Sequence, residues 1–232
     1  AAGAALLSSG LVAVLVEDPE ETTPSNRTLG IRVWAARTER LFDPIFALGL
    51  ATLVMAACFA MLSAIEPEVN ARLEQGPVLF SFEFVALIAV LAVAQPFVGR
   101  ASDDVGRKRF ILIGLVGLVP TTLLQGLVVE PWQMIAVRAL QGVAGAMVFA
   151  PALALAGDYA TKGQSGAQLS VLTVAFGLGI AAGQLLAGFA VQVSFLLPFA
   201  VGAVLAAAGT LIVATQVEDR VAPAEQRAVS HQ

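Results

Sequence analysis

The longest uncharged run in this chain extends from Gly163 to Val217, and it constrains the fold more than any other feature. Its 55 residues include no Asp, Glu, Lys or Arg. As one helix at 1.5 Å per residue the run would be roughly 80 Å long, whereas a bilayer core is about 30 Å thick. The run must therefore fold back once, and we expect the turn at the weakly polar Gln192-Val-Ser194. It predicts two membrane-spanning helices.

Four further apolar runs are long enough to cross a bilayer, because about 20 helical residues suffice. Two of them carry no charge, and the other two carry one charge each, Glu83 and Arg138. Only 13% of the residues are charged, about half the share of a soluble domain. We therefore predict an all-α integral membrane protein with a six-transmembrane-helix bundle over residues 44–217. The four runs are Pro44–Ile65, Gln75–Gly99, Phe110–Val129 and Pro131–Gly157.

The segments outside this bundle have other roles in the prediction. Residues 1–16 are apolar but too short to cross a bilayer, so we expect the end of a truncated transmembrane span. Residues 17–43 begin with an acidic stretch and predict a cytoplasmic linker, in which residues 29–42 form either an interfacial helix or an ordinary loop. Residues 218–232 predict a cytoplasmic tail.

The Lys and Arg residues orient the predicted bundle. Of the 13, eleven lie in segments on one side, while the opposite side holds Arg72 and one span holds Arg138. Cytoplasmic loops of membrane proteins carry an excess of Lys and Arg. We therefore expect a multi-pass protein of the cell membrane, surrounded by membrane lipids, with its linker, the segment after Gly99 and its C-terminus in the cytoplasm. The eleven are Arg27, Arg32, Arg37, Arg40, Arg100, Arg107, Lys108, Arg109, Lys162, Arg220 and Arg227.

A polar segment between two predicted spans carries a specific motif, Gly99-Arg-Ala-Ser-Asp-Asp-Val-Gly-Arg-Lys-Arg109. Its charges and glycines predict a loop at the membrane–water boundary. The segment resembles the cytoplasmic-loop signature of the major facilitator superfamily, in which a glycine, an aspartate four residues on, and Gly-Arg-Arg/Lys follow in order. The matching positions are Gly99, Asp103, Gly106, Arg107 and Lys108, and Asp104 stands where the family usually has a basic residue.

The resemblance covers nearly the whole chain and implies the C-terminal half of a twelve-span transporter. A partial span, a linker, six spans and a tail follow in that order. The resemblance therefore implies a missing N-terminal half as a partner, a small-molecule substrate bound between the halves, and protons as a second partner. We expect no cofactor, no metal and no nucleic acid.

By the same resemblance, the signature segment belongs to a latch that holds one conformation. We expect Asp103, Arg107 and Asp158 to form its charge cluster, with Asp158 at the cytoplasmic end of the span that carries Arg138. The alternative is that these charges anchor separate helix ends at the membrane surface, where each contributes little.

Two charges inside spans are candidates for proton coupling or for lining a substrate cavity. Arg138 is seven residues after Pro131, about 10 Å into the membrane, where an unpartnered charge is costly. The segment Arg138-Ala-Leu-Gln141-Gly142-Val-Ala-Gly145 resembles the family motif Arg-x-x-Gln-Gly-x-Gly, except that its second glycine stands one position later. In drug–proton antiporters the arginine of this motif is associated with proton coupling. Glu83 is expected at a similar depth and could pair with Arg138. The alternatives are an arginine that reaches the outer interface and a glutamate in contact with water.

Small residues and prolines shape the predicted spans. Gly142, Gly145, and the pair Gly179 and Gly183 leave flat surfaces on which helices can pack closely. We expect bends at four prolines inside spans, because neighbouring helices can satisfy the carbonyl that a proline releases. These are Pro96, Pro120, Pro151 and Pro198.

Together these features predict a secondary active transporter. The apolar, Ala-rich spans favour proton-coupled export of a hydrophobic or amphipathic small molecule; uptake of a small metabolite and a non-transporting membrane-embedded remnant are the alternatives. An enzyme is not expected, because the one histidine, His231, lies in the tail. The spans therefore hold no Ser–His pair, imidazole metal site or His-ligated haem.

Overall fold

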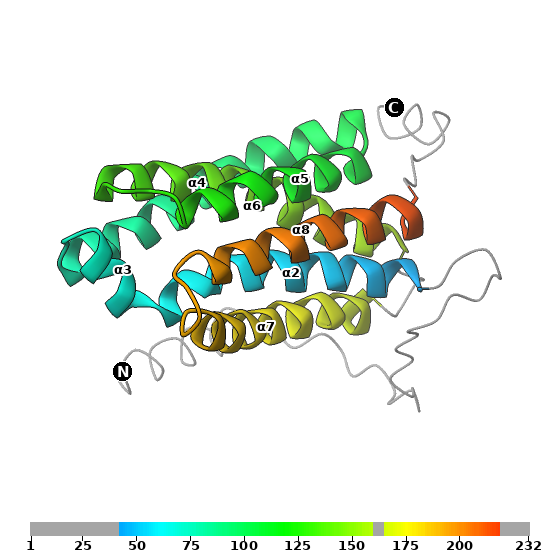
Figure 1. The fold of residues 1–232 in the computed structure, drawn as a ribbon. Helices are drawn as coiled ribbons and strands as arrows, with labels where there is room; N and C mark the ends of the chain where they lie inside the picture. Colours follow the sequence, from blue (N-terminus) through cyan, green and yellow to red (C-terminus); the bar gives the residue numbers. More distant parts are fainter. Residues whose placement is uncertain (1–41, 160–164, 219–232) are drawn as a thin grey trace, which may run out of the picture. The chain divides into compact units, whose positions relative to one another are not determined.

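The computed structural model describes residues 42–159 and 165–218, and this part of the chain folds into seven helices (Figure 1). The expected partial span, the linker up to residue 41 and the tail beyond Glu218 lie outside the described residues. The helices are α2 (Pro44–Ala64), α3 (Glu66–Arg72), α4 (Pro77–Val105), α5 (Arg107–Gln125), α6 (Pro131–Tyr159), α7 (Ser165–Ala190) and α8 (Leu197–Gln216).

Within the described residues, six helices are long and apolar enough to cross a membrane, which confirms the predicted all-α membrane bundle. The long uncharged run turns between α7 and α8, at residues 191–196. The remaining helix, α3, has only seven residues and connects α2 to α4. This short helix was not expected from the sequence.

Prolines mark the start of several helices. Pro44, Pro77 and Pro198 lie in the first turn of α2, α4 and α8, where the N–H that proline lacks would have no partner within the helix. The Asp43 side chain caps α2, because its Oδ1 accepts a hydrogen bond from the Ile45 N–H at 3.0 Å. The expectation that Pro198 bends a span is therefore wrong, since this proline starts α8. The other three expected prolines lie inside helices, namely Pro96, Pro120 and Pro151.

The signature segment is not the expected loop. Helix α4 continues to Val105 and α5 begins at Arg107, so that Gly106 alone separates the two helices. Gly106 has a φ of 117°, which favours glycine because a Cβ would be strained there. The prediction of a loop is wrong because the polar residues continue α4 beyond its apolar part. Asp103 and Arg107 are therefore both held on helices.

The six long helices pack in two related sets of three. Helix α2 packs against α7, and α6 packs in the same way against α4. Likewise α5 packs against α6, while α2 packs against α8. These pairings are preserved when α2, α4 and α5 are exchanged for α6, α7 and α8 respectively, although α6 also touches α7 while α2 does not touch α4 in the described part of the chain. Figure 1 shows α2 between α7 and α8, and α5 beside α6.

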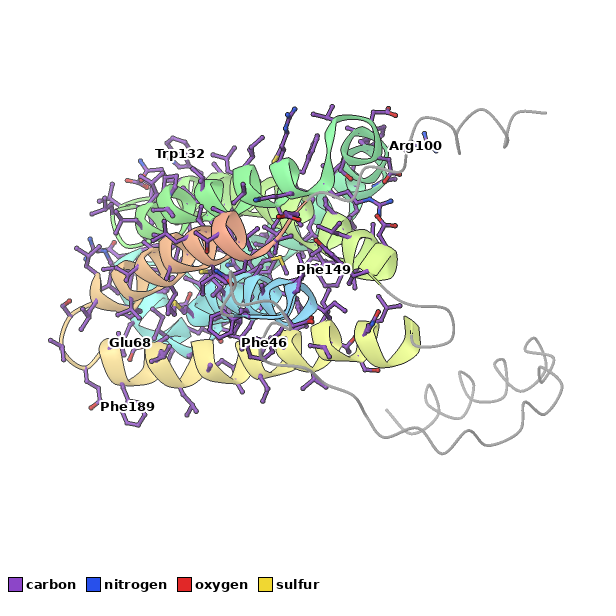
Figure 2. All side chains as sticks on the ribbon, turned by 90° about the vertical axis from the view of Figure 1, so that its right-hand side faces the viewer. Phe46, Glu68, Arg100, Trp132, Phe149 and Phe189 are labelled. Atoms are coloured by element: carbon purple, nitrogen blue, oxygen red, sulfur yellow. The ribbon has the colours of Figure 1, made fainter. Side chains whose placement is uncertain are left out.

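Apolar side chains occupy both the centre and the outside of the bundle. Most of α2 is buried, with Leu48, Met55 and Met61 fully enclosed. In contrast, large apolar side chains of α4 and α7 are exposed along much of their length. Figure 2 shows Trp132 and Phe189 pointing away from the helices, and both are mostly exposed. Such an apolar exterior is typical of a surface in contact with lipid or with other membrane helices.

Four glycines lie where helices approach each other closely. A Cβ at Gly179 or Gly183 would meet the backbone of α2 at Leu53 or Ala57. A Cβ at Gly142 would meet the backbone of α4 at Leu87, and one at Gly145 would meet the Phe59 ring. These positions leave no room for a larger side chain unless the helices move apart.

Candidate functional site

Two polar clusters lie at opposite ends of the bundle. The first is at the end where α4 and α6 finish and α5 begins, which we call the Arg107 end. The second lies inside the bundle toward the other end, where α3 connects α2 to α4, which we call the α3 end. Helices α4 and α6 both run from the α3 end to the Arg107 end.

At the Arg107 end, the guanidinium of Arg107 on α5 binds carboxylates of α4 and α6. Arg107 Nε donates to Asp103 Oδ1 at 2.9 Å, and its Nη2 lies 2.8 Å from the same oxygen. Arg107 Nη1 also donates to Asp158 Oδ2, near the end of α6. The break at Gly106 lets the last turn of α4 and the first turn of α5 share these contacts. Arg107 thus links α4, α5 and α6 through two carboxylates.

Neighbouring side chains tie α8 and α2 to the same end. Lys108 Nζ donates to the Ala214 carbonyl at 2.9 Å, in the last turn of α8, where the helix dipole favours a cation. Tyr159 Oη donates to the Glu218 carbonyl at 2.6 Å, just after α8 ends. Gln216 Oε1 accepts from the Phe42 N–H at 3.0 Å, just before α2 begins. Five helix ends therefore meet through polar contacts.

These contacts are only partly shielded from water. The side chains of Arg107, Asp158 and Asp103 are 22%, 38% and 56% exposed. Ion pairs with such exposure contribute at most about 1 kcal/mol each. A Cβ at Gly99, the first residue of the motif, would meet no atom within 4 Å, so no close helix contact explains this glycine.

The second cluster surrounds Arg138, which is fully buried on α6. Its Nη1 donates to Gln141 Oε1 at 2.7 Å and to the Phe59 carbonyl of α2 at 3.3 Å. The guanidinium also lies over the Phe84 ring of α4, 4.7 Å from its centroid. Gln141 in turn donates to the Thr122 hydroxyl of α5 at 3.2 Å. Polar groups from α2, α5 and α6 thus meet inside the bundle.

Glu83 on α4 is the one carboxylate among the described residues that is fully buried. Its Oε1 accepts a hydrogen bond from Gln75 Nε2 at 2.7 Å, and the same Gln75 nitrogen donates to Asn70 Oδ1 of α3 at 3.2 Å. Among the described residues, Glu83 Oε2 and the Nε and Nη2 of Arg138 have no hydrogen-bond partner. Glu83 and Arg138 attract each other electrostatically, but they form no ion pair within 4.0 Å.

The contact at Gly142 connects the two charges. Gly142 is one helical turn beyond Arg138 on α6, and Leu87 is one turn beyond Glu83 on α4. Because a Cβ at Gly142 would lie 2.5 Å from the Leu87 carbonyl oxygen, the helices touch there through backbone. The close approach of α4 and α6 therefore sets the separation of the two buried charges.

Three residues of the second cluster were not predicted from the sequence. Gln75, Thr122 and Phe84 contact Glu83, Gln141 and Arg138 respectively. Thr122 could have been found from the sequence, because it is a polar residue inside an otherwise apolar span. Among the described residues, no three His, Cys, Asp or Glu side chains come together as a metal site would require.

The chain matches one protein family and is similar to several individual proteins. A family model for the Major Facilitator Superfamily matches residues 48–231, more than half of the chain. The chain is 31% identical over 182 residues to "Tetracycline resistance protein, class D" of Salmonella ordonez, a match that covers 75% of this chain and 44% of that protein. It is 32% identical over 151 residues to "Multidrug resistance protein MdtG" of Dickeya zeae (strain Ech586), covering 65% of this chain and 36% of that protein.

A further relative is named as a probable transporter. The chain is 31% identical over 123 residues to the "Probable actinorhodin transporter" of Streptomyces coelicolor, covering 52% of this chain and 21% of that protein. The match covers less than half the length of each of these three curated relatives.

Proposed function

Because the chain belongs to the Major Facilitator Superfamily, we propose that the complete protein is a secondary transporter that exports hydrophobic or amphipathic antibiotics in exchange for protons. Transporters of this superfamily bind substrate near the middle of the membrane, between two six-helix halves. The bundle described above would be one such half. The protein would therefore be a transporter rather than an enzyme.

The names of the relatives support export and a drug-like substrate. Two of them are named for resistance to tetracycline or to multiple drugs, and a third is named as a probable transporter of actinorhodin. Each of these names describes a protein that confers tolerance to, or moves, an organic compound. Export accounts for resistance, because it lowers the concentration of the compound in the cell.

The observation that carries proton coupling is the burial of Glu83 and Arg138 inside membrane-spanning helices. Charged side chains in such positions are costly, and they commonly mark proton or substrate pathways. Simple helix packing would be served better by apolar residues of the same size. The pair therefore supports a role in coupling transport to protons.

The contacts at the Arg107 end support a latch. Arg107 binds Asp103 and Asp158 from different helices, and these exposed ion pairs are weak enough to break during a transport cycle. We place this end in the cytoplasm, because the Lys and Arg residues of the predicted loops gather on that side. The latch would then stabilise one conformation of the transport cycle. Its loss would shift the balance between the conformation that is open to the cytoplasm and the conformation that is closed to it.

Drug accumulation in cells tests the proposed function. The complete protein would be expressed in a bacterial host that lacks its major drug exporters, and the cellular content of tetracycline and of puromycin would be measured. We expect lower content than in cells with an empty vector, and a return to the vector level when a protonophore removes the proton gradient. Equal content in both strains would contradict transport of these compounds, and higher content in the expressing cells would indicate uptake.

A further inference from the structure

We propose that α3 is a strap that holds the α3 end of the bundle closed, and that the contact of Arg72 with Phe195 fastens this strap. The contact has to open when the transporter exposes its substrate path at this end, which by the proposed orientation faces the outside of the cell. The role of the strap in the transport cycle rests on the proposed function. The contact itself can be tested without any transport.

Helix α3 is held in place by apolar packing along one of its faces. Ile65, Val69 and Leu73 follow each other at intervals of four residues, and all three are buried. Because an isolated helix of seven residues is not stable in water, this packing is what keeps α3 folded. The three residues belong to one apolar cluster with side chains from five of the six long helices. These include Met61 of α2, Phe80 of α4, Met134 of α6, Ala187 of α7 and Phe199 of α8.

Arg72, the last residue of α3, contacts a different part of the bundle. Its Cζ lies 4.6 Å from the centroid of the Phe195 ring, in the turn between α7 and α8. Glu66, Glu68 and Glu74 lie in the same segment of the chain, yet Arg72 forms no ion pair with any described residue. The guanidinium is therefore placed for a cation–π interaction rather than for a salt bridge.

Phe195 is a firm attachment point, because its own ring is packed. The Phe195 and Phe199 rings have their centroids 5.5 Å apart, and Phe199 is fully buried in the first turn of α8. A Cβ at Gly126, where α5 ends, would lie 2.9 Å from the Phe199 ring. The Arg72 contact thus connects α3 to α8 and, through Phe199, to the end of α5.

The other polar contacts of α3 do not reach this turn. Asn70 donates to Glu66 Oε1 at 3.4 Å and accepts a hydrogen bond from Gln75 Nε2 at 3.2 Å. In the part of the chain that the structure describes, these contacts stay within α3 and the segment that leads to α4. Loss of the Arg72 contact would therefore free α3 from the α7–α8 turn while its connection to α4 remains.

The contact is of a kind that can break and form again. Arg72 is exposed, and a cation–π interaction at an exposed site is weak. Glu74, two residues further on, has a φ of 49°, a left-handed conformation that is costly for a residue with a side chain. The closed arrangement thus combines a weak contact with a strained turn, so a modest force is enough to lift α3 from Phe195.

Thiol labelling of the complete protein in lipid nanodiscs tests whether Arg72 holds α3 down. Val69 is fully buried, so a cysteine in its place reacts with a water-soluble maleimide only when α3 lifts. The labelled peptide that contains residue 69 is quantified by mass spectrometry, which separates it from cysteines elsewhere in the protein. When reclosing is fast, the labelling rate follows the fraction of lifted α3.

Four changes in the Val69→Cys protein give the expected pattern. Arg72→Ala should label about two- to fivefold faster, the effect of losing one exposed cation–π contact. Phe195→Leu should act similarly, and its combination with Arg72→Ala should be hardly faster than either alone, because both remove the same contact. Glu68→Ala, at an exposed position of the same helix, is the control and should keep the parent rate.

Equal rates for Arg72→Ala and Glu68→Ala, or effects of Arg72→Ala and Phe195→Leu that multiply, would overturn the proposed contact. If Phe195→Leu does not fold, two milder variants take its place. Arg72→Lys keeps a cation and Phe195→Tyr keeps a ring, so both should label more slowly than Arg72→Ala. A rate as fast as that of Arg72→Ala in both would exclude a cation–π contact.

Cross-linking tests whether α3 must lift during transport. Arg72→Cys and Phe195→Cys, joined by a reducible bifunctional thiol reagent in lipid vesicles, should abolish tetracycline transport until a reducing agent releases the link. Glu68→Cys with Arg72→Cys, one turn apart on α3, is the control, since the same reagent then leaves the α7–α8 turn free. Full transport with α3 linked to residue 195 would overturn the strap. If the wild type moves no tetracycline, the proposed function fails for this compound, and the labelling rates still decide whether Arg72 fastens α3.

Discussion

Gly142 on α6 touches the backbone of Leu87 on α4, so closely that a methyl group at Gly142 would lie 2.5 Å from the Leu87 carbonyl oxygen. That oxygen belongs to the helix backbone and cannot rotate away as a side chain could. The contact therefore holds α4 and α6 at one separation. Because Glu83 and Arg138 lie one turn away, this separation also controls the buried charges.

Replacing Gly142 by alanine should force α4 and α6 apart. Overpacking of this kind costs about 1–3 kcal/mol. We expect Gly142→Ala to lower the free energy of unfolding by this amount, measured by SDS-induced unfolding of the purified protein in mixed micelles. Gly188→Ala on α7 is the control, because a Cβ there meets no atom within 4 Å. Equal stability of the two variants would mean that the α4–α6 contact is not tight.

The ion pair between Arg107 and Asp158 should appear as an energetic coupling. In a double-mutant cycle with Arg107→Ala and Asp158→Asn, the effects on unfolding free energy should be non-additive by about 0.5–1 kcal/mol, since the pair is partly exposed. The control cycle combines Arg107→Ala with Asp104→Asn. Asp104 is an exposed acid on the last turn of α4, and no ion pair between it and Arg107 is seen. Additivity in the Arg107–Asp158 cycle would remove the basis for the latch.

The break between α4 and α5 should depend on glycine. Gly106 has a φ of 117°, a conformation that costs a residue with a Cβ about 1–3 kcal/mol. We expect Gly106→Ala to lower the free energy of unfolding by this amount and to weaken the Arg107–Asp158 coupling, because α5 would start at a changed angle. Gly99→Ala, in a helical and open position, is the control. An unchanged coupling energy in the Gly106 variant would show that the break does not position Arg107.

The long uncharged runs made the six spans predictable from the sequence, because length and apolar character alone decide whether a helix can cross a bilayer. They did not reveal which face of each span points inward. A helix that is apolar all round has no periodic pattern from which a buried face could be read. The environment of Arg138 could therefore be anticipated only as a costly charge, and the Phe59 carbonyl and Phe84 ring that hold it required the structure.

Residues near the ends of spans were harder to interpret. Gln75 precedes α4 and had no visible role in the sequence, since its contacts with Asn70 and Glu83 depend on how α3 folds back. The segment from Gly99 to Arg109 was interpreted as a loop because it is polar, although polar residues also continue helices beyond the membrane. The motif indicated Asp103 and Arg107, and the family resemblance indicated Asp158 at the end of another span. Their actual contacts depend on the single break at Gly106.

The hydrogen bond between Gln141 and Arg138 should contribute to the stability of the bundle. Gln141 Oε1 accepts from Arg138 at 2.7 Å, while the Gln141 amide donates to Thr122 and to the Cys58 carbonyl. Gln141→Leu keeps a similar volume but removes the shorter of the two acceptors of Arg138 Nη1 and leaves the Phe59 carbonyl at 3.3 Å. A buried donor that loses a partner costs about 1–3 kcal/mol, more if it is charged. We expect a loss of unfolding free energy in this range.

The combination of Gln141→Leu with Arg138→Leu separates that cause from a loss of packing. Without the guanidinium, no charged donor remains unpaired, so the double variant should be more stable than Gln141→Leu alone. It should also lose uphill, gradient-driven tetracycline transport, since the counter-charge to Glu83 is gone. If the second substitution instead adds to the instability, the cost of Gln141→Leu comes from packing or from the Thr122 and Cys58 contacts. In that case Gln141 would not be the residue that stabilises the buried charge of Arg138.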